Sequence, residues 1–368
     1  MPRQGRVLSE DNEVRRVQTD HDERQDHLRA MMRTYASAHH SVVAFDLDGE
    51  TAEFLHSGVR LTDVPPEDVI FEIGSITKVF TGILLCLLVE EGKVDPRAPL
   101  AEMSEDLADT PAQLTPERLI SHTSGLPNIY MPIWRAAITP MPNGPYADFS
   151  RADLLRWLAN WKGKPALALR HAYSNLGVGL LAEAMAIQAG RPFIDLLTEK
   201  VIAPLGLKDT TDSLGKGQQC RFAQPRDTKG RAVAPWIFQA LAAAGCLRSS
   251  GRDLAHFSKR LTQALVAPET ALDRAICRSA VPIVGLGRSG AMETSAQCSG
   301  WIRTRTSPEI LHASGGTAGS TCALYVCPER RAACAILSNN GIAASLWGSM
   351  KLSRSNQSRQ AEQFFGMA

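Results

Sequence analysis

The N-terminal part of the chain changes from a helical to a strand-like pattern of apolar residues. Residues 1–20 are polar and charged, which predicts a disordered or loosely attached arm. Residues 21–38 carry apolar side chains at helical spacing and predict an amphipathic helix. Residues 41–48 and 51–58 are expected to form two strands, because the Asp48-Gly49 dipeptide that separates them is a strong signal for a two-residue hairpin turn.

A buried helix is predicted after a short strand-like run at residues 69–73, which ends at Gly74. Six apolar side chains then recur on one helical face: Ile76, Val79, Phe80, Ile83, Leu84 and Leu87. Gly92 is placed to end this helix, since glycine readily adopts the left-handed conformation that follows many helices.

The middle of the chain is punctuated by proline and glycine and predicts short helices without strands. These helices are expected at residues 115–121, 151–160, 176–189, 193–203 and 252–264. Strands are predicted again near the C-terminus, at residues 310–313, 320–326 and 332–337, with a Pro-Glu-Arg-Arg turn between the last two. A final helix is expected to begin near Ala343.

Strands at both ends of the chain, around a helical middle, predict an α/β protein with one sheet assembled from both termini. We assign residues 21–94 and 265–368 to a sheet lobe. Residues 95–264 form an inserted helical lobe in this prediction, and the active site is expected between the two lobes.

Composition and charge narrow the class of protein. The 368 residues are 44% hydrophobic and 21% charged, which excludes a disordered chain, a collagen and a coiled coil. A net charge of +2 creates no overall field that attracts nucleic acid or an anionic membrane. The longest apolar run, residues 79–89, is shorter than the roughly 20 residues of a bilayer span. We therefore expect neither a nucleic-acid partner nor a membrane partner.

The first twenty residues also lack the apolar core and small-residue cleavage site of a secretory signal, so a cytoplasmic location is expected. The eight cysteines are then expected to be reduced thiols. No Cys-x-x-Cys pair is present, and no histidine spacing suggests a zinc site. We predict neither a metal nor a cofactor, and the oligomeric state stays open.

The first candidate for chemistry is Ser75, which begins the buried helix one turn before Lys78. Residues three apart share a helical face, and the amides at a helix start favour negative charge. A lysine partly removed from water has a lowered pKa and can accept a proton from a serine hydroxyl. The spacing alone fits a capping serine and a solvated lysine equally well. A second Ser-x-x-Lys, at Ser213 and Lys216, has no apolar helical face and is interpreted as a surface turn.

The second candidate is the Tyr173-Ser174-Asn175 segment, whose first and third side chains would face one cleft if the backbone is extended. A tyrosine beside an ammonium group is shifted toward phenolate and can act as a general base and then as an acid. The amide of Asn175 can bind a substrate carbonyl. Asn175 can also cap the helix that follows, and the two roles are compatible.

The third candidate is the glycine-rich run from His312 to Gly319. Glycines in or beside a strand let a ligand approach the backbone closely. The amide of Gly316, together with that of Ser75, could form an oxyanion hole. The alternative is a simple bend that leads into the C-terminal hairpin.

Taken in order, these motifs resemble the serine β-lactamase and penicillin-binding-protein superfamily, and within it the class C β-lactamase-like branch. The supporting segments are Phe71–Lys78, Ile120–Pro127, Tyr173–Gly177, Ala203–Leu207, Ala244–Leu247 and Arg252–Leu254. The resemblance implies an antiparallel sheet flanked by helices, with an inserted all-helical lobe. It also implies catalysis by Ser75, Lys78 and Tyr173.

The same resemblance implies a substrate-binding strand that carries His312, Ser314, Gly316 and Thr317. The family usually has Lys-Thr-Gly or His-x-Gly immediately before the oxyanion residue. Aligning the glycines places Ala313 where the cation should be, and we prefer this alignment. A bulge in the strand would instead turn His312 inward. Loss of the cation argues mildly against penicillin-like substrates.

The leading prediction is a serine acyl hydrolase or acyltransferase that works through an acyl-enzyme on Ser75, with a small acyl compound such as a carboxylic ester as substrate. A β-lactamase or D-Ala-D-Ala peptidase is one alternative, and an inactive binding protein of the same fold is another. An α/β-hydrolase elbow around Ser314 would need a following helix, whereas the sequence there reads as a strand. The aromatic residues Tyr130 and Trp134, with Met131, either line the cleft or pack between the lobes.

Overall fold

One antiparallel sheet runs through the centre of the protein. The computed structural model describes residues 4–61, 63–132, 141–161, 170–289, 292–304, 307–344, 352 and 357–366. The eight strands lie in the order β2-β1-β10-β9-β8-β7-β6-β5, and every neighbouring pair is antiparallel. Their bounds are β1 Ser41–Asp48, β2 Thr51–Gly58, β5 Val284–Ser289, β6 Met292–Gln297, β7 Ile302–Thr304, β8 Leu311–Gly316, β9 Thr321–Cys327 and β10 Ala332–Ser338.

The sheet joins the two ends of the chain, because β1 pairs with β10 along its whole length. Both predicted hairpins are present. Gly49 lies in the β1–β2 turn with φ +58°, a conformation that glycine takes without strain. The mixed α/β fold and its antiparallel sheet, expected from the sequence, are therefore confirmed.

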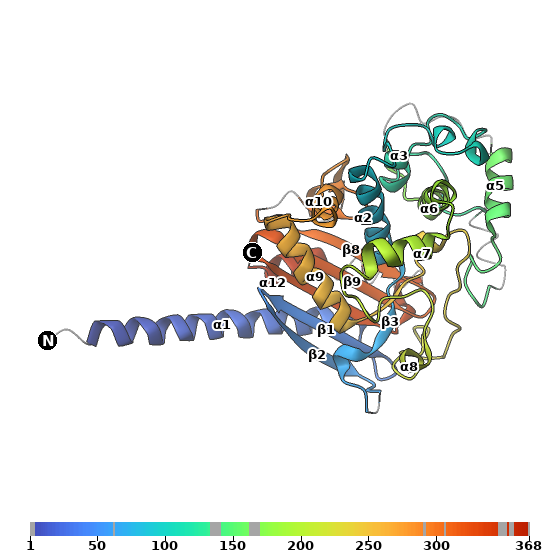
Figure 1. The fold of residues 1–368 in the computed structure, drawn as a ribbon. Coiled ribbons are helices and arrows are strands. Elements are labelled where there is room, and N and C mark those ends of the chain that lie inside the picture. The colour runs from blue at the N-terminus through green and yellow to red at the C-terminus, as the bar shows by residue number, and fades with distance from the viewer. Residues whose placement is uncertain are drawn as a thin grey trace.

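Helices cover both faces of the sheet (Figure 1). On one face lie α2 (Thr77–Glu90), α9 (Gly251–Val266) and α10 (Ala271–Ser279), and α9 packs on β1 and β10. On the other face lie α12 (Gln357–Phe364) and the C-terminal part of α1 (Gln4–Tyr35), which pack against each other, while the N-terminal part of α1 extends beyond the sheet (Figure 1). Because side chains of a strand alternate between faces, the sheet supplies one row of apolar residues to each of these two cores.

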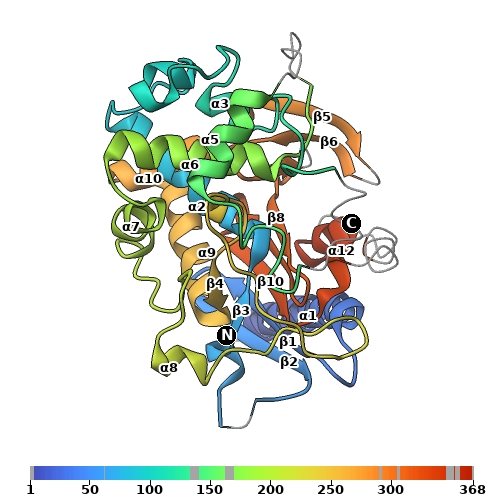
Figure 2. The same cartoon turned by 90° about the vertical axis from the view of Figure 1, so that its right-hand side faces the viewer.

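A helical lobe stands beside α2 (Figure 2). It contains α3 (Pro116–Ile120), α5 (Arg151–Asn160), α6 (Asn175–Ala189) and α7 (Phe193–Leu197), and α8 (Lys216–Gln219) follows in a long connection. A small two-stranded sheet of β3 (Ile70–Glu72) and β4 (Arg248–Ser250) brings the chain back toward the start of α2. The predicted helices of this region are present within a few residues of their expected bounds, although the one at 193–203 ends as a π-helical turn over Thr198–Ile202.

Two boundaries differ from the sequence prediction. Residues 4–20 belong to the single long helix α1, where a disordered arm was expected. This segment is rich in glutamate, arginine and glutamine, which favour a helix once its C-terminal half is anchored on the sheet. The helix α9, assigned by sequence to the helical lobe, packs on the sheet instead. No helix in the described ranges is both long and apolar enough to span a bilayer.

Candidate active site

Ser75 lies in a tight turn between β3 and α2. The turn is a 3-10 helix over Gly74–Ile76, and it runs directly into α2. Gly74 has φ +49°, and a Cβ atom there would lie 2.6 Å from the backbone nitrogen of Gly316. Glycine is therefore required both for the turn and for the close approach of β8. The result is a half-buried serine at the start of a buried helix.

Three predicted residues meet at the Ser75 hydroxyl. The Nζ atom of Lys78 donates to Ser75 Oγ at 2.9 Å, and the hydroxyl of Tyr173 lies 2.8 Å from the same oxygen. Lys78 comes from one helical turn further along α2, and Tyr173 comes from the segment before α6. The sequence prediction of these three as one catalytic group agrees with this geometry.

Lys78 is buried, and its ammonium has few partners. Its Nζ donates to the backbone carbonyl of Ala244 at 2.6 Å and lies 5.0 Å from the centre of the Tyr173 ring. Burial lowers the pKa of Lys78, and the adjacent Tyr173 opposes that shift. A lysine in this environment gives up its proton more readily than a lysine in water, which suits it to accept a proton during catalysis.

His122 is a local hydrogen-bonding group that contacts the backbone on both sides of Tyr173. Its carbonyl accepts from the amide of Ala172 at 2.8 Å, and its Nδ1 accepts from the amide of Ser174 at 3.2 Å, so it holds the backbone on both sides of Tyr173. The two rings lie 4.5 Å apart. Burial lowers the pKa of His122 to about 3, so the imidazole is neutral at ordinary pH. In the sequence, the signal for this role is the position of His122 in the Ser-His-Thr-Ser-Gly segment at residues 121–125.

Of the two polar atoms in the Asn175 side-chain amide, one has a hydrogen-bond partner and one has none. Its Nδ2 donates to the hydroxyl of Tyr146 at 2.9 Å, while its Oδ1 is buried without a hydrogen-bond partner. The cap of α6 is Ser174, whose hydroxyl accepts from the amide of Gly177 at 2.8 Å. The alternative role of Asn175 as the helix cap is therefore taken by its neighbour.

The strand β8 runs directly past the nucleophile turn, which is the 3-10 turn Gly74–Ile76 that carries Ser75. A Cβ atom on Gly315 would lie 1.9 Å from the carbonyl oxygen of Ile73 and 2.8 Å from the amide nitrogen of Ser75. Only glycine permits this approach. The contact of Gly74 with Gly316 places the amides of Ser75 and Gly316 in the same part of the site, as the sequence predicted.

The other predicted residues of β8 do not face Ser75. The strand pairs with β9 without a bulge, so its side chains alternate regularly. His312 therefore lies on the opposite face, where its ring stacks on Tyr325 at 5.9 Å and burial lowers its pKa to about 4. Ser314 points to that same face and is exposed. Its strand is followed by β9 and by no helix, so the α/β-hydrolase elbow is wrong.

Thr317 is buried in the turn after β8, where its hydroxyl donates to Glu72 at 2.6 Å. The Thr317 hydroxyl is therefore used in a hydrogen bond inside the protein and does not contact the Ser75 hydroxyl. The second Ser-x-x-Lys is at the surface, with Ser213 exposed, as predicted. Within the described residues, no three His, Cys, Asp or Glu side chains are grouped so as to hold a metal ion.

Of the aromatic residues near the cleft, Tyr130 packs inside the helical lobe. Its ring stacks on Phe149 at 3.9 Å, and its hydroxyl donates to the carbonyl of Pro145. This contact favours the packing interpretation for Tyr130. Trp134 lies outside the described residues.

One protein-family model matches most of the chain. The Beta-lactamase family model matches residues 28–345, which include every part of this site. The chain belongs to the beta-lactamase family. Since Gly315 faces Ser75, the geometry supports the alignment that places Ala313 at the cation position.

Several named proteins are similar to this chain in sequence. The D-alanyl-D-alanine-carboxypeptidase/endopeptidase AmpH of Escherichia coli (strain K12) is 34% identical over 161 residues, which are 43% of this chain and 40% of that protein. A beta-lactamase of Providencia stuartii is 27% identical over 62% of this chain and 56% of its own length. Penicillin-binding protein 4 of Amycolatopsis lactamdurans is 24% identical over 89% of this chain and 87% of its own length. This chain thus matches only about half of the first two relatives.

Two solved structures share this fold over nearly their whole length. The beta-lactamase/D-alanine carboxypeptidase of Pseudomonas syringae has a TM-score of 0.75 with 19% identity, over 95% of this chain and 99% of that chain. The class C beta lactamase of Rhodobacter sphaeroides has a TM-score of 0.72 with 19% identity, over 91% of this chain and 98% of that chain. At this level of identity the likeness establishes the fold.

Proposed function

We propose that this protein is a serine acyl hydrolase or acyltransferase that forms an acyl-enzyme on Ser75. One observation carries the proposal: the Ser75 oxygen lies 2.9 Å from Lys78 Nζ and 2.8 Å from the Tyr173 hydroxyl. A serine hydroxyl is a weak nucleophile unless a nearby base takes its proton. An inactive binding protein would have no need for this arrangement around a half-buried hydroxyl.

The hydrogen bonds define a route for the proton. Burial lowers the pKa of Lys78, and a neutral Lys78 amine takes the Ser75 proton across the 2.9 Å that separate Nζ from Oγ, while the Tyr173 hydroxyl keeps its own proton beside the same oxygen. As Ser75 Oγ bonds to the substrate carbonyl carbon, the carbonyl electrons move onto oxygen, beside the amides of Ser75 and Gly316. When this intermediate collapses, the bond to the leaving group breaks, Tyr173 gives its hydroxyl proton to the leaving atom, and the Lys78 ammonium restores a proton to Tyr173.

Release of the acyl group repeats these steps with a second nucleophile. Water then gives hydrolysis, and an alcohol or amine gives acyl transfer. In both cases the neutral Lys78 amine takes the proton of the incoming nucleophile, with the Tyr173 hydroxyl as relay, and returns it to Ser75 Oγ as the ester bond breaks. The same three side chains therefore serve both half-reactions.

The residue at the cation position supports an uncharged acyl substrate. Ala313 is buried on the face of β8 that is turned toward Ser75, and it offers no charge to a substrate carboxylate. Penicillins and D-Ala-D-Ala peptides both carry such a carboxylate. We therefore place small carboxylic esters first. The names of the relatives favour the second candidate, a beta-lactamase or D-alanyl-D-alanine carboxypeptidase.

Turnover of three substrate classes tests this proposal. Short p-nitrophenyl esters should react faster than a cephalosporin or a peptide that ends in D-Ala-D-Ala. Ser75→Ala should abolish turnover, while Ser213→Ala, which changes an exposed serine, should leave it unchanged. Faster turnover of the cephalosporin or the peptide would show that this compound, and not the ester, represents the substrate class. Full activity in Ser75→Ala would refute the acyl-enzyme.

A further inference from the structure

We propose that Glu72 and Thr317 form a clamp that positions the oxyanion-binding amide of Gly316 relative to Ser75. The inference rests on the proposed function and adds two positioning residues to it. Neither side chain touches the Ser75 hydroxyl. Glu72 lies three residues before Ser75, and Thr317 directly follows Gly316, so a bond between them ties together the two backbone segments that carry the oxyanion amides.

The contacts of Glu72 join three segments. Its Oε2 accepts from the Thr317 hydroxyl at 2.6 Å, and its Oε1 accepts from the backbone amide of Trp236 at 2.7 Å. The side chain is only 4% exposed and Thr317 only 1% exposed, so water does not compete for these bonds. Two donors aimed at two different oxygens fit an ionised carboxylate, which accepts hydrogen bonds at both.

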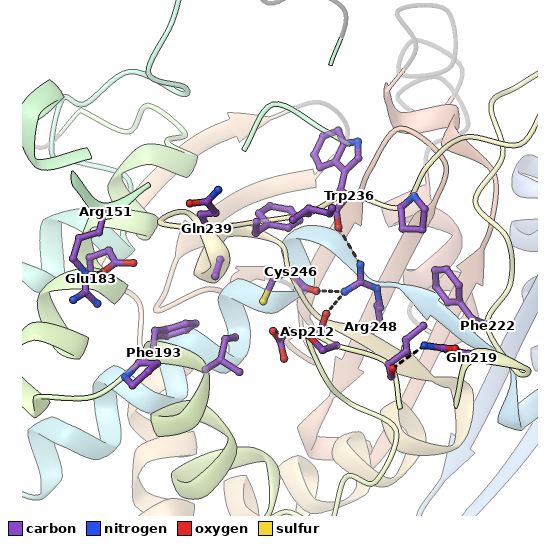
Figure 3. Close-up of a pocket in the computed structure, with 18 residues that line it drawn as sticks. Arg151, Glu183, Phe193, Asp212, Gln219, Phe222, Trp236, Gln239, Cys246 and Arg248 are labelled. Carbon is purple, nitrogen blue, oxygen red and sulfur yellow. Dashed lines mark hydrogen bonds and ion pairs between the residues drawn. The ribbon is translucent and has the colours of Figure 1, made fainter. Parts of the chain in front are cut away.

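One arginine balances the charge of Glu72. A guanidinium nitrogen of Arg248 lies 3.9 Å from Glu72 Oε1. The same nitrogen donates to the carbonyl of Trp236 at 3.0 Å (Figure 3). The same guanidinium also donates to the carbonyl of Asp212. Burial raises the pKa of Glu72, while the bonds from Thr317 and Trp236 and the charge of Arg248 oppose that shift. A buried acid with this many partners is held in one position.

The Gly316 amide needs a contact that fixes its position, because β8 and its regular pairing end at Gly316. The amide of Thr317 already belongs to the turn into β9, where it donates to the carbonyl of Ser320 at 2.9 Å. Glycines at 74 and 315 allow the nucleophile turn and β8 to touch, but they contribute no side chain that could fix their distance. Removal of an oxyanion-hole donor slows enzymes by about 10²–10³-fold, so its placement matters for the transition state.

This role predicts an effect on kcat rather than on KM. Thr317→Val removes the donor and keeps the shape of the side chain. We expect it to lower kcat for a p-nitrophenyl ester by roughly 10-fold or more, since a misplaced donor acts on the transition state, and to leave KM within about twofold. Thr317→Ser retains the hydroxyl and should recover most of the activity.

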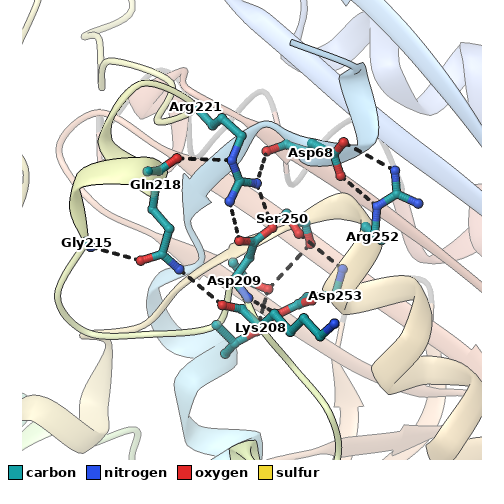
Figure 4. Close-up of polar contacts among 12 residues, drawn as sticks. Asp68, Lys208, Asp209, Gly215, Gln218, Arg221, Ser250, Arg252 and Asp253 are labelled. Carbon is teal, nitrogen blue, oxygen red and sulfur yellow. Dashed lines mark hydrogen bonds and ion pairs between the residues drawn. The ribbon is translucent and has the colours of Figure 1, made fainter.

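The protein contains a matched control for lost stability. The hydroxyl of Thr210 donates to Asp253 at 2.9 Å, and both side chains are buried. Asp253 belongs to a polar network with Asp209 and Arg221 (Figure 4), and the hydrogen bonds of these side chains among the described residues include none to Ser75, Glu72 or Thr317. Thr210→Val should lower the melting temperature much as Thr317→Val does, yet keep kcat.

A double-mutant cycle completes the test. Glu72→Gln and Thr317→Val should each lower kcat, and the double variant should lose little more than the worse single variant, because both break one contact. The clamp is refuted if Thr317→Val matches Thr210→Val in both kcat and melting temperature, or if the two kcat losses multiply. The proposed function is tested separately: it fails if the Ser75→Ala variant keeps the turnover of the wild-type protein, whatever the clamp variants show.

Discussion

At the residue scale, Ser75, Lys78 and Tyr173 form one hydrogen-bonded group around the Ser75 oxygen. Lys78 lies within 2.9 Å of Ser75 Oγ and 5.0 Å of the Tyr173 ring centre. The sequence predicted this group because helical spacing relates Ser75 to Lys78 and because the tyrosine motif has a recognisable pattern. It did not predict the partners of the His122 hydrogen bonds, which are backbone groups on both sides of Tyr173.

We expect the losses caused by Lys78→Ala and Tyr173→Phe to be non-additive. Each should lower kcat/KM for an ester by roughly 10²–10⁴-fold, the range for general acid–base catalysis. The double variant should lose far less than the product, since residues that act as a unit share one effect. Steady-state kinetics of the four proteins measures this. Near wild-type turnover in Tyr173→Phe would remove the tyrosine from the proton route.

The pH dependence of the reaction follows from the burial of Lys78. Burial lowers the pKa of Lys78, so the lysine loses its proton at a lower pH than a free lysine does. We therefore expect kcat/KM to rise with pH along a limb whose midpoint lies below the ordinary lysine pKa of about 10.4. The limb should disappear from the residual activity of Lys78→Ala. A limb unchanged in that variant would assign the titration to another group.

At the element scale, the site depends on how closely β8 passes the turn before α2. Local patterns predicted both hairpins and α2, because a turn dipeptide or a helical face is written in neighbouring residues. The face that His312 occupies could not be predicted in the same way. A shift of one residue exchanges the two faces of a strand, and only the unbroken pairing of β8 with β9 settles which face is which.

The contact of β8 with the nucleophile turn predicts a large effect of one methyl group. A Cβ on Gly315 would lie 1.9 Å from the Ile73 carbonyl oxygen, so Gly315→Ala should lower the free energy of unfolding by about 1–3 kcal/mol and slow ester turnover. Gly285 in β5 has open space around its Cβ position and supplies the control. Gly285→Ala should keep turnover. Thermal unfolding and ester kinetics would contradict the packing if both variants behaved like the wild type.

At the scale of the whole molecule, the two ends of the chain build the sheet, and the middle builds the helical lobe that brings Tyr173 to Ser75. The sequence predicted this arrangement because strand patterns occur only near the ends. It misplaced α9, because an amphipathic helix does not reveal whether its apolar face packs on a sheet or on other helices. The bond of Glu72 to Thr317 was equally hidden, since it joins residues 245 positions apart.

The most direct measurement of the central claim is the site at which a fluorophosphonate probe attaches. Among the serines that the structure describes, only Ser75 combines a helix start with a lysine Nζ and a tyrosine hydroxyl within 3 Å of its oxygen. Intact-mass analysis and peptide mapping of the wild-type protein should therefore show one adduct, on Ser75, that is absent from Ser75→Ala. Labelling of Ser213 or Ser314 instead, or no labelling at all, would contradict the account of Ser75 as the nucleophile.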